Sequence, residues 1–181
     1  MAYKLEKTVV LVGMMGAGKT AVGIALAKLL GVEFCDTDAE IERAANMKIS
    51  EIFARDGEEF FRDREAEVLS RMLLETPCVL STGGGAFLSE RNRRTVDRAG
   101  FSVWLKADLE LLWARVRHKN TRPLLQTDNP KETLRQLCET REKCYALADV
   151  AVAACPDYSI DEMAAKVARE LLMYDDVLKG P

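Results

Sequence analysis

The sequence lacks the residues and patterns that mark several large classes of protein. It has one histidine, His118, and five cysteines that form no C-x-x-C pair, so a zinc site has too few well-spaced ligands. Lys and Arg number 26 against 29 Asp and Glu, a net charge of −3 that is unlike the basic balance of nucleic-acid-binding proteins. No stretch approaches the length of a membrane span, and residues 1–7 lack the apolar run of a signal peptide. We therefore expect a cytoplasmic protein with no nucleic-acid or membrane partner.

Length and composition favour a single domain. Of the 181 residues, 48% are hydrophobic and 30% charged, so we expect one unit, residues 1–181, with a core large enough to fold without disulfides. The cysteines are odd in number, and we interpret most of them as small core residues in a reducing compartment. No low-complexity linker or internal repeat divides the chain, and a monomer is our expectation.

Short runs of β-branched residues alternate with helical patterns, which is typical of βα units around a parallel sheet. Strands are predicted at residues 8–12, 33–35, 78–80, 101–105 and 150–153. Helices are predicted at residues 19–30, 89–99, 109–117, 131–147 and 160–172, and a helical stretch at 39–74 with breaks near 46–50 and 56–57. That stretch is too long for a minimal crossover, so part of it is predicted to be an inserted lobe, with a short helix capped by Ser50. The helix at 19–30 is expected to carry one face of Val22, Ala25, Leu26 and Leu29.

The segment GMMGAGKT at residues 13–20 matches G-x-x-x-x-G-K-[ST] between a predicted strand and a predicted helix. Its glycines let backbone N–H groups wrap a polyanion, and the helix that follows adds the positive end of its dipole. Lys19 supplies a mobile charge for the outer phosphates, and the Thr20 hydroxyl is a natural Mg²⁺ ligand. We therefore predict an ATP and Mg²⁺ site formed by Gly13, Gly16, Ala17, Gly18, Lys19, Thr20 and Ala21.

Acidic residues and glycines follow the second and third predicted strands, at the sheet edge where ligands gather in open α/β sheets. Asp36 and Asp38 have D-x-D spacing, which on an extended segment points both carboxylates the same way. One can orient the Mg²⁺ shell while the other holds or deprotonates an acceptor hydroxyl, unless Asp38 is only a helix N-cap. The STGGG run at residues 81–85 offers a substrate bare N–H groups, or else is a flexible turn.

Three arginines are candidates for contacts with anionic groups. Arg62 and Glu65 are three residues apart on a predicted helix, so they form either a rigid carboxylate clamp or a solvated ion pair. Arg122 lies in the aperiodic segment 118–130, which we interpret as a mobile loop that brings a cation over ATP when it closes. Arg115, on the helix before it, either lies over an adenine ring or is exposed. His118 is interpreted as a solvated loop residue.

These segments together resemble the shikimate kinase family, over about residues 9–152. The resemblance rests on the segment 13–20, DTD at 36–38, SEIFARDGEEFFRDRE at 50–65, LSTGGG at 80–85, RPLL at 122–125, and Arg141 followed by Tyr145 and Ala148-Asp149. It implies a nucleoside-monophosphate-kinase-like α/β fold. In that fold, three αβα layers surround a five-stranded parallel sheet, with a lid at about 118–130 and a small helical substrate-binding lobe at about 37–65.

The resemblance also implies a role for each matching residue. Lys19 and Thr20 would serve the phosphates and Mg²⁺, with Asp36 and Ser81 acting on the metal through water. Asp38 would bind the ring hydroxyls of shikimate and act as a base. The carboxylate of shikimate would pair with Arg62 and Arg141, with backbone contacts from Gly83, Gly84 and Gly85, and Glu65 would hold Arg62 in place. Arg122 would be the lid cation, and Arg115 would stack on adenine.

Two positions depart from the family pattern. A proline usually stands two residues after Arg141, where this chain has Lys143, so the helix is expected to run on and aim the guanidinium differently. Asn46 replaces a frequent glycine between the first two helices of the lobe, and asparagine tolerates positive φ.

The leading hypothesis is ATP-dependent phosphorylation of the 3-hydroxyl of shikimate. One alternative is a kinase for another small hydroxy acid such as gluconate, or for a nucleoside monophosphate. A different class is a nucleotide-sensing module without catalysis; a GTPase switch is disfavoured because no N-K-x-D tetrapeptide occurs. An acceptor panel separates these possibilities.

Overall fold

The computed structural model describes residues 2–119 and 122–181, and seven helices and seven strands are found in this part of the chain. The helices are α1 (Lys19–Leu30), α2 (Thr37–Ala45), α3 (Ile49–Met72), α4 (Glu90–Ala99), α5 (Leu109–Val116), α6 (Pro130–Tyr145) and α7 (Ile160–Leu171). The strands are β1 (Lys4–Leu5), β2 (Thr8–Val12), β3 (Phe34–Asp36), β4 (Val79–Ser81), β5 (Gly100–Lys106), β6 (Val150–Ala153) and β7 (Leu178–Lys179). All five predicted strands are confirmed to within about one residue.

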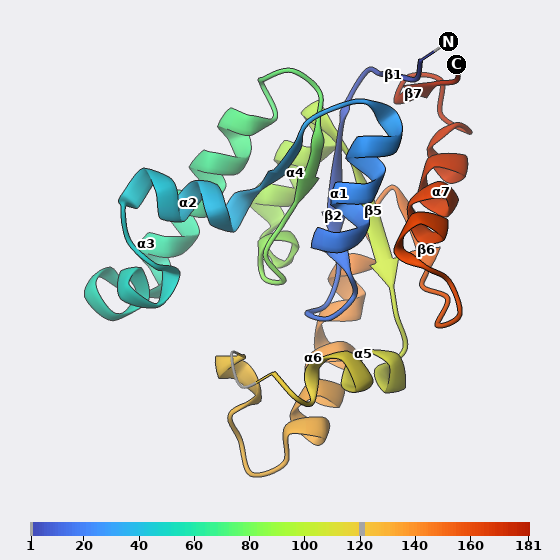
Figure 1. The fold of residues 1–181 in the computed structure, drawn as a ribbon. Coiled ribbons are helices and arrows are strands. Elements are labelled where there is room, and N and C mark those ends of the chain that lie inside the picture. The colour runs from blue at the N-terminus through green and yellow to red at the C-terminus, as the bar shows by residue number, and fades with distance from the viewer. Residues whose placement is uncertain (1, 120–121) are drawn as a thin grey trace.

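A five-stranded parallel sheet in the order β3-β4-β2-β5-β6 forms the centre of the molecule. β2 is its middle strand, with Val9 opposite Val79 on one side and Phe101 on the other, and all five of its residues are buried. A strand covered on both faces requires a continuous apolar run, which TVVLV supplies. Helices cover the two faces: α1 and α7 pack together on one, and α4 lies on the other (Figure 1). The predicted three-layer α/β architecture is confirmed.

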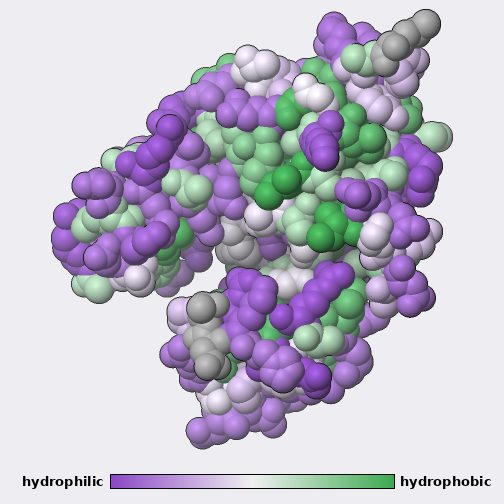
Figure 2. Space-filling view, viewed as in Figure 1, coloured by the Kyte–Doolittle hydropathy of each residue, from purple (hydrophilic) through white to green (hydrophobic). Residues whose placement is uncertain are grey.

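The α2–α3 hairpin projects from the sheet as a separate lobe (Figure 1). Helix α2 ends at Asn46, which has φ of 50°, as its tolerance of positive φ suggested. Helix α3 is kinked at Gly57, where φ is 84° and ψ is 174°, so the break predicted at 56–57 is confirmed. The prediction for Ser50 is wrong: Lys48 precedes the helix, and its N–H donates to the Glu51 carboxylate at 2.7 Å. A surface hollow separates this lobe from the part that contains α5 and α6 (Figure 2).

Two finer expectations are corrected. Helix α1 buries Gly23, Ala27 and Leu30 beside Val22 and Leu26, while Leu29 is 42% exposed. The reason is that α1 packs on both the sheet and α7, which shifts its buried stripe. Only two of the five thiols are buried, Cys78 and Cys138, whereas the other three are partly exposed.

The chain ends and the loop before α6 contain structure that periodicity did not predict. β1 pairs antiparallel with β7, with Leu5 opposite Leu178, so the two ends of the chain lie together. Two-residue strands are too short to show a period. Within the segment predicted as a loop at 118–130, one turn of 3₁₀ helix covers Pro123–Leu125, and Leu125 is buried. Residues 120–121 of that segment lie outside the described residues.

Candidate active site

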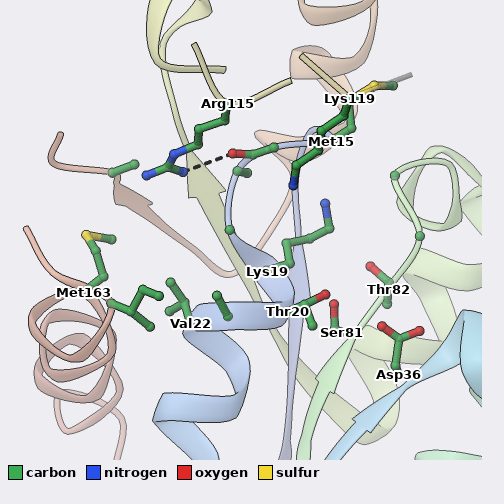
Figure 3. Close-up of a pocket in the computed structure, with 18 of the residues that line it drawn as sticks. Met15, Lys19, Thr20, Val22, Asp36, Ser81, Thr82, Arg115, Lys119 and Met163 are labelled. Carbon is green, nitrogen blue, oxygen red and sulfur yellow. Dashed lines mark hydrogen bonds between the residues drawn. The ribbon is translucent and has the colours of Figure 1, made fainter. Parts of the chain in front are cut away.

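A cavity of about 570 Å³ lies at the carboxyl ends of β2, β3 and β4, where parallel sheets place their ligands. Figure 3 shows that one end holds Asp36, Ser81 and Thr82, that Lys19 and Thr20 lie in the middle, and that Met163 and Val22 lie at the other end. The predicted ATP and metal residues Lys19, Thr20, Asp36, Ser81, Arg115 and Arg122 all line this one cavity.

The loop at residues 13–20 has the backbone that its glycines predict. Gly13, Gly16 and Gly18 have φ of 142°, 81° and 94°, a region that other residues rarely adopt. A Cβ on Gly16 would stand 2.7 Å from Cγ1 of Val116, so the loop also packs tightly on α5. Gly18 is the N-cap of α1 and makes no side-chain cap, which leaves the helix start open to an anion. Within the loop, the Ala17 N–H donates to the Met14 carbonyl at 3.1 Å.

Lys19 is held inside this loop. Its Nζ donates to the carbonyls of Gly13 at 2.7 Å and Met14 at 2.9 Å. Burial and the charge of nearby Arg122 together lower the pKa of Lys19 to about 8, while Asp38 opposes the shift. An arriving polyphosphate would offer this ammonium group stronger, charged acceptors than two carbonyl oxygens.

Asp36 ends β3 and begins α2. Its Oδ1 accepts the N–H groups of Asp38 at 2.8 Å and Ala39 at 3.1 Å, so Asp36 is the helix N-cap, not Asp38 as the alternative interpretation had it. The expectation that both carboxylates share an extended segment is also wrong, because Asp38 lies in the first turn of α2. Strand register places Asp36 opposite Ser81 of β4, and the two side chains lie near each other at the carboxyl ends of the strands, beside Thr20 (Figure 3).

Three consecutive glycines each face a different charged side chain. A Cβ on Gly83 would lie 3.0 Å from Oδ1 of Asp38, one on Gly84 would lie 3.1 Å from Nη1 of Arg141, and one on Gly85 would lie 2.6 Å from Nη2 of Arg62. The side chains come from α2, α6 and α3, so the structure brings all three together at the end of β4. Any side chain on this run would occupy the space they use, which favours a built site over a flexible turn.

Arg62 is held by a buried carboxylate. Its Nη1 donates to Oε2 of Glu65 at 2.9 Å, and the Glu65 side chain is 1% exposed. Burial raises the pKa of Glu65, an effect that the Arg62 guanidinium opposes. Glu65 Oε1 is buried with no partner among the described residues. This geometry matches the rigid clamp and not the solvated ion pair.

Arg141 reaches the glycine run although Lys143 stands where the family has proline. Helix α6 continues without a break to Tyr145, as expected from the missing proline. Tyr145 is fully buried, and its hydroxyl donates to the Gly84 carbonyl at 2.7 Å. The tyrosine thereby links α6 to the backbone that faces Arg141, a positioning contact that the sequence did not reveal.

Asp38 lies in a partly desolvated position between acids and bases. Burial raises the pKa of Asp38 above the ordinary aspartate value, and Asp36 and Glu42 raise it further, while Lys19 and Arg62 oppose the shift. A carboxylate with a raised pKa is a better proton acceptor than an ordinary aspartate.

Cations cover the side of the cavity opposite the sheet. Arg115 donates from Nη1 to the Gly16 carbonyl at 3.0 Å, so it lies against the 13–20 loop (Figure 3). Arg122 is close enough to Lys19 to lower its pKa, and its Nε is buried without a partner among the described residues. Lys119 lines the same side and was not predicted. Pocket-lining cations exceed pocket-lining acids, so the cavity suits an anionic ligand.

Sequence reasoning missed one whole wall of the cavity. It is formed by the loop after β6 and the start of α7, with the lining residues Ala154, Tyr158, Ser159, Ile160 and Met163. The signal that could have found it is positional, because this loop follows the carboxyl end of the last parallel strand.

No group of three or more His, Cys, Asp or Glu residues that could hold a metal occurs in 2–119 and 122–181. None of the helices within those ranges is long and apolar enough to cross a membrane.

Comparisons with known proteins converge on one family. A family model described as shikimate kinase matches residues 15–172. A shikimate kinase of Cereibacter sphaeroides is 61% identical over 97% of this chain and 88% of its own length. The solved structure of the Acinetobacter baumannii shikimate kinase in complex with shikimate superposes with a TM-score of 0.86 at 39% identity, covering 93% of this chain and 94% of its own. A gluconokinase from Sinorhizobium meliloti has a TM-score of 0.59 at 20% identity over 92% of this chain and 94% of its own, a likeness of fold alone.

Proposed function

The chain belongs to the shikimate kinase family, and we propose that its cavity transfers the γ-phosphoryl group of ATP to the 3-hydroxyl of shikimate. The observation that carries the proposal is the approach of Asp38, Arg141 and Arg62 to three consecutive glycines. A hydroxylated ring carboxylate needs cations to bind its carboxylate and a carboxylate side chain to accept hydrogen bonds from its hydroxyls. It also needs backbone without side chains, so that it can approach closely. The cluster supplies all three.

In this proposal the phosphates of ATP occupy the loop at residues 13–20. Backbone N–H groups and the open start of α1 face the phosphates, and Lys19 exchanges its two carbonyl acceptors for phosphate oxygens. The adenine lies toward Arg115 and the wall formed by residues 154–163, since the opposite end of the cavity holds Asp36 and Ser81. Donor and acceptor thus meet above Thr20.

Mg²⁺ fits the donor atoms that run from Thr20 in the middle of the cavity to Asp36 and Ser81 at one end (Figure 3). Thr20 offers a hydroxyl for direct coordination, and Asp36 and Ser81 offer a carboxylate and a hydroxyl that act through water. These are hard oxygen ligands, too few for a dedicated cage, as expected for a cation that arrives with nucleotide phosphates. A bound Mg²⁺ would neutralise charge on the β- and γ-phosphate oxygens.

The residues of the chain then have defined tasks in the transfer. The acceptor hydroxyl oxygen forms a bond to the γ-phosphorus as the bond from that phosphorus to the bridging β–γ oxygen breaks. Asp38 takes the hydroxyl proton, and its raised pKa suits it to do so. Lys19 and Arg122 hold the charge that moves onto the transferred group and the departing ADP. Arg62 and Arg141 anchor the carboxylate of shikimate, so that the reacting hydroxyl is oriented.

The proposal includes a cytoplasmic monomer. It also treats residues 37–65 as the lobe that binds shikimate and residues 118–130 as the lid, within one domain. Arg62 and Glu65 on the lobe and Arg122 on the loop are the side chains that support this division.

The test is ADP release from the purified chain with ATP and Mg²⁺, measured with shikimate, with gluconate and without an acceptor. We expect release that depends on shikimate, and ³¹P NMR should show the phosphate on the 3-hydroxyl. Turnover with gluconate and none with shikimate would show that the acceptor is gluconate and not shikimate. ATP binding without turnover on any acceptor would favour a nucleotide-sensing module.

A further inference from the structure

The end of the cavity farthest from Asp36 has a wall made by one short loop. The loop joins β6 to α7, and its apolar side chains are left open: Tyr158 is 43% exposed and Ile160 is 53% exposed, although both line the cavity. Met163 and Val22 continue this apolar surface below Arg115 (Figure 3). A flat aromatic base placed there would cover these side chains, so the position of the loop sets how well the base fits.

A single lysine of α7 contacts this loop at several points on the side away from the cavity. Lys166 Nζ donates to the Ala153 carbonyl at 2.8 Å and lies 3.4 Å from the Cys155 sulfur. The same ammonium group stands 5.9 Å from the centre of the Tyr158 ring, within the range of a cation–π contact. One side chain therefore contacts the end of β6, the middle of the loop and the aromatic residue that lines the cavity.

The other fixed points of the loop do not depend on Lys166. A capping box joins Ser159 and Glu162 and secures the first turn of α7. The Tyr158 N–H donates to the Cys155 carbonyl at 3.1 Å and closes a turn. The Ala154 N–H also donates to the Lys106 carbonyl of β5 at 2.7 Å. Lys166 adds a further link, from this turn to α7 and to Ala153, the last residue of β6. Its loss should loosen the wall and leave the helix start and the sheet intact.

We propose that Lys166 is a positioning residue for the purine base: by fastening residues 153–158 to α7, it holds the wall on which the base of ATP packs. The inference rests on the proposed function, since it assumes ATP as the donor. Lys166 does not line the cavity and touches no reacting atom. It acts on donor affinity through the loop and leaves the chemical step unchanged.

The experiment compares Lys166→Met, Lys166→Arg and Lys28→Met with the wild-type chain. Methionine keeps much of the apolar stem and removes the charge and the donors, while arginine retains both. Lys28 is an exposed lysine in the last turn of α1 and serves as the matched control. Calorimetry measures binding of ATP and of tripolyphosphate, which carries phosphates but no base, and initial rates give kcat and KM for ATP.

For Lys166→Met we expect ATP binding and KM to worsen by about three- to tenfold, the worth of one or two lost hydrogen bonds. Binding of tripolyphosphate and kcat at saturating ATP should stay at the wild-type values. Lys166→Arg should keep ATP affinity near the wild-type value, and Lys28→Met should match the wild type.

Three results would overturn the inference. Unchanged ATP affinity in Lys166→Met, with normal binding by the wild type, would remove Lys166 from nucleotide recognition and leave the proposed function standing. An equal loss for ATP and tripolyphosphate would show that Lys166 acts through charge or general stability and not through the base. Failure of the wild-type chain to bind ATP would overturn the proposed function and this inference with it.

Discussion

In the donor half of the cavity, defined as residues 13–20, one contiguous segment supplies the backbone groups, the lysine and the hydroxyl. In the acceptor half, defined as Asp38, Arg62, Arg141 and the glycines at 83–85, the groups come from three helices and the end of β4. The donor half can therefore serve any nucleoside triphosphate enzyme, because its shape depends on local backbone. The acceptor half depends on the tertiary fold, and selectivity for the acceptor resides there.

The largest effect is expected on kcat, from a change at Asp38, the residue of the acceptor half that is proposed to take the hydroxyl proton. Asp38→Asn keeps the shape of the side chain and removes its capacity to take a proton, so kcat should fall by about 1,000-fold. ATP affinity by calorimetry should remain within about twofold, because Asp38 belongs to the acceptor half. Full activity in this variant would remove proton transfer to Asp38 from the mechanism.

A smaller effect tests the clamp beneath Arg62. Glu65→Gln removes the buried charge that orients the guanidinium, and we expect KM for shikimate to rise about tenfold with KM for ATP unchanged. Glu67→Gln is the matched control, because Glu67 pairs with Arg64 at the same i,i+3 spacing, 2.8 Å away, but on the exposed face of α3. An equal rise in both variants would mean that the burial of Glu65 is irrelevant to binding.

The smallest effect concerns the charge of the donor half. The pKa of Lys19 is lowered to about 8 in the ligand-free chain, so its Nζ loses a proton as pH rises through that value, well below the range of an ordinary lysine. ATP affinity should therefore fall about fivefold between pH 7 and pH 9. Calorimetry on Lys19→Met should show weaker binding without this pH slope, and the same slope in the variant would assign it to another group.

Local patterns were sufficient to predict the sheet and the donor half. Strands such as TVVLV are apolar runs with definite ends, and the loop at residues 13–20 is complete within eight residues. For the acceptor half, residue patterns gave candidates but left alternatives open, such as a clamp or a solvated pair for Arg62 and Glu65. Burial of Glu65 decides that question, and burial is a tertiary property. Arg141 was predicted only through family resemblance.

The predictions that were wrong or missing also depended on tertiary structure. Spacing alone suggested that Asp36 and Asp38 share an extended segment, whereas the chain turns into α2 directly after Asp36, which caps the helix. Tyr145 and the wall at residues 154–163 reach the cavity only because α6 and α7 pack where they do. No local signal in the sequence marks such contacts.

The most direct test of the division into a donor half and an acceptor half uses two glycine variants. For each variant, initial rates are measured while the concentrations of ATP and shikimate are both varied, which gives a KM for each substrate. In Gly85→Ala the new Cβ would displace the Arg62 guanidinium, and in Gly16→Ala it would strain the donor loop against Val116. Gly180→Ala, whose Cβ would meet only Leu172 at 3.6 Å, is the control. We predict that Gly85→Ala raises KM for shikimate alone and that Gly16→Ala raises KM for ATP alone. Equal increases in both constants in both variants would contradict the division.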